Sequence, residues 1–206
     1  MKFRILAILP PVAALAVAAL ATAGHAADTT PKPFTVTSSS WKDNAMMARK
    51  YAGKGATNPN CDGDNVSPPL SWSNAPAATK SYAILMIDPD GANGQGSVNW
   101  VAYDIPASKT SLKRGEANTP GPDIVYGDAQ NGMPNGLYLG PCPPYGQLPH
   151  HYVITVIATD LAPDALQPGL TRDAFLDALK GHALVSSSHI VRYAHPAANT
   201  MPSDRM

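Results

Sequence analysis

The alternation of short apolar runs with proline and glycine constrains the fold of this chain most strongly. The sequence contains 21 Pro and 16 Gly residues, spread through most of its length. Both residue types interrupt regular structure, so the stretches between them suit short strands joined by turns better than long helices. No internal repeat or low-complexity linker divides the chain. We therefore expect a single, mainly β domain.

The candidate strands are runs rich in β-branched and aromatic residues. Several are almost wholly apolar, which is typical of strands covered on both faces, as in the middle of a sandwich. One helix is expected, with Thr171 as its cap and Phe175, Leu176, Leu179 and Ala183 on one face. The expected strands are 34–37, 81–87, 98–105, 151–159 and 190–193.

The first 26 residues have the layout of a signal peptide. Lys2 and Arg4 precede an uncharged run rich in Ala, Leu and Val, and small residues follow at 24–26, where a signal peptidase would cut. An uncleaved membrane anchor is the alternative, because the run is nearly long enough to span a bilayer. The Pro-Pro pair at 10–11 interrupts the apolar run, and the small residues at 24–26 resemble a cleavage site. Both features favour cleavage. This predicts a periplasmic or secreted protein with no stable membrane anchor.

The charge balance excludes some partners. The chain has 15 Lys and Arg residues against 15 Asp and Glu, with no basic run. Such a chain lacks the electrostatic footprint that nucleic acids or anionic membranes require. The part beyond the signal peptide has the size of one ordinary domain. We expect that domain at 32–195, followed by a C-terminal tail at 196–206.

Cys61 and Cys142 are the only cysteines in the sequence. Both would reach an oxidising compartment after export, where an even number of cysteines favours one disulfide. Two small buried thiols are the alternative.

Several familiar motifs of catalysis and metal binding are missing from the sequence. There is no G-x-S-x-G elbow and no P-loop. The Asp-Pro-Asp-Gly segment at 88–91 starts like a calcium loop, but Ala92 and Asn99 stand where ligands are needed. The histidines do not show the spacing of a zinc site. We therefore expect no metal and no cofactor, and we assign no catalytic residue.

Three other segments form a distinctive set. They are Asn-Val-Ser-Pro-Pro-Leu-Ser-Trp at 65–72, Asp-Pro-Asp-Gly at 88–91 with Asn-Trp-Val at 99–101, and Gly-Pro-Cys-Pro-Pro-Tyr-Gly at 140–146 with Pro-His-His-Tyr at 149–152. In this order and spacing they resemble the phosphatidylethanolamine-binding protein family, also called Raf-kinase-inhibitor-like proteins. The cysteine at 142 resembles the bacterial branch.

The resemblance implies an antiparallel β-sandwich with one or a few short helices and a small pocket for phosphate-like anions. Asp88 ends one expected strand and His150 begins another, so an acid and a titratable base can lie together at the mouth of the pocket. Together they would offer a hydrogen-bond acceptor and a donor to one phosphate-sized group. Carried over by motif, the ligand-binding residues are Asp88, Asn99, Pro144, His150 and Tyr152, with Asp90, Trp100 and Pro143 in support.

The chain departs from the family pattern at Asn99. The family usually has a histidine immediately before the aromatic residue, which is Trp100 in this chain. An asparagine donates and accepts hydrogen bonds but carries no charge. This predicts weaker anion binding than two histidines would give, and it weakens an acid–base catalytic role.

We therefore interpret the chain as an exported protein that binds a phosphate-like anion or a phospho-headgroup and could modulate another, unidentified protein. Two alternatives stay open at this point. One is a hydrolase that uses Asp88 and His150, and the other is a protein-only inhibitor. The second alternative rests on family analogy alone.

Export predicts cleavage at or within a few residues of Ala26. The charged start, the apolar run and the small residues at its exit are the physical signals that the export machinery reads. Intact-mass measurement of protein from the exported fraction checks this prediction. A mass that retains residues 1–26 would instead support the membrane anchor.

Overall fold

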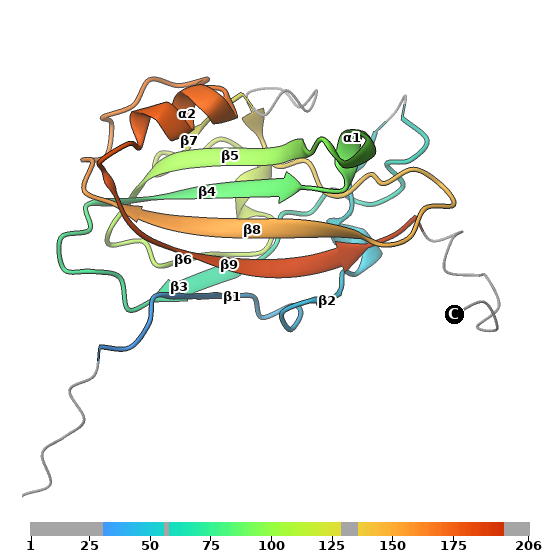
Figure 1. Ribbon diagram of the computed structural model, residues 1–206, viewed down its shortest axis with the longest axis horizontal. Coiled ribbons are helices and arrows are strands. Elements are labelled where there is room, and N and C mark those ends of the chain that lie inside the picture. Colours follow the sequence, from blue (N-terminus) through green and yellow to red (C-terminus); the bar gives the residue numbers. More distant parts are fainter. Residues whose placement is uncertain (1–30, 56–57, 129–135, 196–206) are drawn as a thin grey trace, which may run out of the picture. The chain divides into compact units, whose positions relative to one another are not determined.

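A computed structural model describes residues 31–55, 58–128 and 136–195 (Figure 1). The expected signal peptide at 1–26 and the tail at 196–206 lie outside these residues. Within the described ranges, no helix is both long enough and apolar enough to cross a membrane.

Two β-sheets form the domain, and their facing sides enclose the main core. Neighbouring strands run antiparallel except for the short parallel pair of β2 and β9. The predicted antiparallel, mainly β sandwich is thus confirmed. The larger sheet has the order β2 (Ala45–Met46), β9 (Ala183–Tyr193), β8 (His150–Thr159), β4 (Ser81–Asp88), β5 (Ser97–Pro106) and β7 (Val125–Tyr126), and the smaller sheet has the order β1 (Thr35–Thr37), β3 (Leu70–Ser73) and β6 (Ser111–Leu112).

β4 and most of β5 are buried on both faces, as their apolar sequences predict, whereas one face of β8 carries an exposed His151. Because successive side chains of a strand point to opposite faces, Ile84 and Met86 of β4 enter the core between the sheets. Ala83 and Leu85 enter a second core on the other face. The same alternation places Asp88 on the face of Met86, and His150 on the face of Ile154. The pattern that builds the core therefore also points the acid and the histidine to the same side.

The helix α2 (Arg172–Ala178) closes the second core. Thr171 caps it, since its Oγ1 accepts a hydrogen bond from the backbone N–H of Ala174 at 3.3 Å. Phe175 and Leu179 are buried against the sheet. The expected place of Ala183 on this helix is wrong. Gly181 takes a φ of 81°, a left-handed conformation that ends the helix, and Ala183 begins β9 instead.

The remaining helical segments named within the described ranges are short turns in the connections. They are α1 (Gly91–Gly94) between β4 and β5, η1 (Arg49–Tyr51) after β2, and η2 (Glu116–Asn118) after β6.

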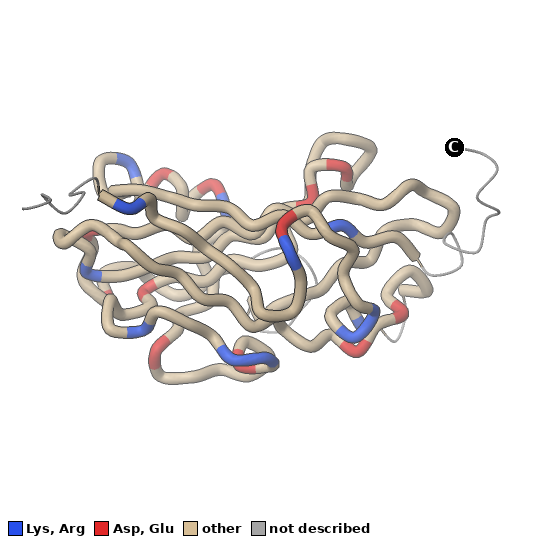
Figure 2. The backbone as a smooth tube through the Cα atoms, turned by 90° about the horizontal axis from the view of Figure 1, so that it is seen from below, with Lys and Arg blue, Asp and Glu red and all other residues tan. Residues whose placement is uncertain are grey.

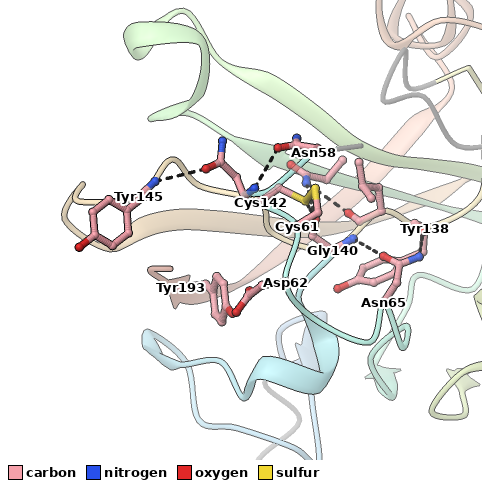
Figure 3. The surroundings of a disulfide bond; sticks show 12 residues. Asn58, Cys61, Asp62, Asn65, Tyr138, Gly140, Cys142, Tyr145 and Tyr193 are labelled. Carbon is pink, nitrogen blue, oxygen red and sulfur yellow. Dashed lines mark hydrogen bonds between the residues drawn. A yellow bond between two sulfur atoms is a disulfide. The ribbon is translucent and has the colours of Figure 1, made fainter. Parts of the chain in front are cut away.

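The disulfide between Cys61 and Cys142 joins two loops that lie 81 residues apart in the sequence (Figure 3). Asn65 makes a second tie between the same regions: its Oδ1 accepts from the backbone N–H of Gly140 at 2.8 Å, and its Nδ2 donates to the Tyr138 carbonyl at 3.0 Å. Asn60 adds a third, accepting from the Tyr145 N–H at 3.4 Å. The loop after residue 139 is therefore braced along its length.

Removing the disulfide by replacing both cysteines with alanine should lower the free energy of unfolding by about 2–4 kcal/mol, because the closed loop is long. Urea denaturation of the oxidised protein and of the double variant measures this difference. Thiol titration of the denatured, unreduced wild type should find no free thiol; two free thiols would contradict the bond.

Candidate functional site

A pocket of about 260 Å³ opens where β4 ends and β8 begins. Two loops form its walls, one running from the end of β4 through α1 and the other containing the Cys142 disulfide. The pocket is lined by Asp88, Asp90, Gly91, Ala92, Asn93, Ser97, Cys142, Pro143, Pro144, Gln147 and His150. The structure thus brings together Asp88, Pro144 and His150 of the predicted ligand-binding set, with Asp90 and Pro143 beside them.

Asp88 is the best-connected side chain of the pocket. Its Oδ1 accepts hydrogen bonds from the backbone N–H groups of Asp90 at 3.0 Å and Gly91 at 2.9 Å. Its Oδ2 lies 2.8 Å from Nδ1 of His150, and both side chains are almost fully buried. A carboxylate only accepts hydrogen bonds, so Nδ1 carries the proton. The other ring nitrogen, Nε2, is left to face outward.

Gln147 meets that second nitrogen, with its Oε1 at 2.6 Å from Nε2 of His150. A protonated His150 donates from both nitrogens and suits this contact. A neutral His150 suits it equally once the Gln147 carboxamide turns over and offers its NH₂ group. Both charge states of His150 therefore fit the same site. Sequence reasoning missed Gln147, since nothing in the motif distinguishes it from an ordinary loop residue.

Tyr152 and Trp100 lie beneath the pocket and do not line it. The ring of Tyr152 stacks on that of His150 with centroids 6.4 Å apart. Burial first, and then the negative charge of Asp88, raise the pKa of Tyr152 well above its ordinary value. Its hydroxyl lies near Asp88, yet no contact within the described ranges reaches hydrogen-bond geometry. Trp100 is fully buried and packs edge-on against Tyr138.

Asn99 also stands outside the pocket wall. The pairing of β4 with β5 shifts between Met86 and Ile87, which makes Asn99 the extra residue of a β-bulge. Its Nδ2 donates to the carbonyls of Leu139 at 3.2 Å and Gly140 at 3.4 Å. This residue thus holds the opposite wall in place from behind. The sequence alone gives no signal for the bulge.

Asp90 connects the α1 loop to β8. Its Oδ2 accepts from the backbone N–H of His151 at 2.7 Å and lies 2.9 Å from the ring Nδ1 of the same residue. The backbone hydrogen bond, followed by the ring contact, holds the pKa of Asp90 below its ordinary value. Asp90 therefore carries a negative charge near neutral pH at the rim of the pocket.

In the part of the chain that the structure describes, the pocket is lined by two carboxylates, from Asp88 and Asp90, and by no Lys or Arg. Figure 2 shows Lys, Arg, Asp and Glu residues scattered along the chain, with no broad region of one sign. The charge of the pocket therefore depends on His150. With a neutral His150 the pocket is net negative, and protonation reduces that excess by one charge.

The fold and the site together define a β-sandwich protein with a small polar pocket at the ends of its central strands. The family model for phosphatidylethanolamine-binding protein matches residues 37–194. The chain belongs to this family.

Relatives occur in archaea and bacteria. A UPF0098 protein of Methanothermobacter thermautotrophicus is 38% identical over 136 residues, which cover 65% of this chain and 85% of the relative. The solved structure of YbcL from Escherichia coli, described as a new member of the mammalian family, gives a TM-score of 0.69 at 28% identity and covers 78% of this chain and 97% of YbcL. LppC of Mycobacterium tuberculosis, which carries a lipoprotein name, is 32% identical over 140 residues, covering 68% of this chain and 62% of LppC.

Replacing Asp88 by asparagine should destabilise the protein, because an amide cannot accept from two backbone donors and a histidine as a carboxylate does. Loss of one charge-assisted hydrogen bond in a buried site costs about 1–3 kcal/mol. Urea denaturation measures the change, with the exposed Asp173→Asn as the matched control. Equal stability of the two variants would mean that Asp88 does not organise the loop.

Proposed function

We propose that this protein is exported and binds a small phosphate-bearing ligand, either a phosphate-like anion or a phospho-headgroup, in the pocket of Asp88 and His150. The observation that carries the proposal is the buried Asp88–His150 pair. His150 uses Nδ1 for this contact, and its Nε2 faces the pocket of about 260 Å³. That volume accommodates a phosphate group with a few further atoms. Membership of the family supports the same assignment.

Binding would proceed through the protonated form of His150. Its Nδ1–H stays on Asp88, which compensates the ring charge, and its Nε2–H donates to an oxygen of the anion. Gln147 occupies that position in the structure, at 2.6 Å, so its exposed side chain would swing aside. With a neutral His150, the carboxylates of Asp88 and Asp90 would repel the anion. Affinity should therefore rise as the pH falls.

Export is supported by the signal-type sequence at 1–26 and by the lipoprotein name of the relative LppC. A disulfide in the wall of the pocket also suits an oxidising compartment. The proposed partner is a small anion. The balanced numbers of acidic and basic residues do not favour binding of a nucleic acid.

We propose binding in preference to hydrolysis because of what contacts His150. Its second nitrogen is bonded to the Gln147 carboxamide, and no Ser, Thr or Cys group in the described ranges hydrogen-bonds to it. A nucleophile activated by histidine needs that contact.

Sulfate is a suitable probe, since it mimics phosphate and keeps its charge between about pH 5.5 and about pH 8, where a histidine titrates. Calorimetric titration should show tighter binding at the lower pH for the wild type, and His150→Ala should remove this pH dependence. Gln147→Ala should bind severalfold more tightly than wild type, because no side chain competes for Nε2.

The matched control is His182→Ala, which removes an exposed histidine that also pairs with an aspartate, Asp160, at 2.8 Å. It should behave as wild type. If His150→Ala retains the full pH dependence, the proposed pocket is not the binding site.

A further inference from the structure

A second pocket of about 240 Å³ lies beside the same loop. It is lined by the far side of the β4–β5 connection, at Pro89 and residues 94–98, and by Arg172 of α2. Val98 packs with the core beneath α2, whereas Asp88 points toward the face between the sheets. The two pockets therefore lie on opposite sides of the connection between β4 and β5, and Ser97 contributes to both.

The second pocket differs from the first in the charged groups that line it. No carboxylate lines it among the residues that the structure describes, whereas two line the first pocket. Arg172 is the only charged residue that lines it in the described ranges, and Gln95 adds a carboxamide that can donate. Ile87, Pro89 and Val98 supply apolar walls.

The guanidinium of Arg172 has partners for only some of its N–H donors. Its Nη1 lies 3.2 Å from Oδ1 of Asp173, a contact between neighbouring and largely exposed side chains. Its Nε is buried and has no hydrogen-bond partner in the part of the chain that the structure describes. A buried N–H of a charged group without an acceptor is costly, so an acceptor from outside the chain would be favourable here.

We propose that Arg172 and Gln95 form a second anion-binding site, for a small oxyanion such as a carboxylate, sulfate or phosphate group. Arginine holds such groups through paired N–H donors, and its Nε–H is one of the two donors of the common side-on arrangement. Because a guanidinium stays charged at all physiological pH values, this site binds equally well between about pH 5.5 and about pH 8.

Sulfate titrations distinguish this site from the pocket of His150. In the His150→Ala background, sulfate should still bind at about pH 5.5 and about pH 8 with one affinity, since no histidine then contributes. Adding Arg172→Gln should weaken that binding about tenfold or more, the loss expected for charge-assisted hydrogen bonds. Arg172→Lys should recover only part of the lost affinity, because lysine keeps the charge but lacks the paired N–H donors of the guanidinium.

The matched control is Arg114→Gln, which removes an exposed arginine that does not line either pocket. It should leave sulfate binding unchanged, and far-ultraviolet circular dichroism should show that every variant is folded. Equal binding by His150→Ala with and without Arg172→Gln would overturn the second site, as would an equal loss in Arg114→Gln. Absence of a His150-dependent component would refute only the function proposed for the first pocket.

Discussion

The carboxylate of Asp88 organises the functional end of the sandwich. It is almost fully buried, and it accepts two backbone N–H groups from the following loop as well as the Nδ1–H of His150. One side chain thereby connects β4, the α1 loop and β8, three segments whose strand pairing alone would leave the loop free. An isolated buried carboxylate would be very unfavourable, and these three donors make its burial tolerable. The position of His150 and the shape of the pocket both depend on this arrangement.

The opposite wall of the pocket is held by different means. The loop after residue 139 contains no regular structure, yet the Cys61–Cys142 disulfide, the Asn65 side chain and the Asn99 side chain each attach it to the body of the domain. Such cross-links reduce the conformational freedom that a ligand would otherwise have to remove on binding. The pocket is therefore formed in advance, and in the proposed binding mode only the exposed Gln147 side chain would move.

The two pockets on either side of the β4–β5 connection differ in electrostatic character. The first has two carboxylates and depends on a titratable histidine for its positive charge, whereas the second contains a permanently charged arginine. The connection between them is tightly wound, with Ala92 and Asn93 both in left-handed conformations at φ values of 49° and 58°. Such a conformation is costly for alanine and better tolerated by asparagine, and the hydrogen bonds that Asp88 accepts from Asp90 and Gly91 fix the start of this turn.

The sequence by itself determined the mainly β fold, because β4 is apolar on both faces, β8 is rich in β-branched residues, and proline and glycine separate the strands. It also indicated Asp88 and His150, through the family motifs that contain them and through their places at the end and the start of expected strands. The expected oxidising compartment favoured a disulfide between the two cysteines. Only the tertiary structure decided the surroundings of this pair. The bulge that turns Asn99 to the Leu139 carbonyl, the contact of Gln147 with His150 and the place of Arg172 beside residues 94–98 all arise between segments without a shared periodic pattern. Strand periodicity is a local property of the chain, whereas these contacts depend on how loops fold back across the ends of the sheets.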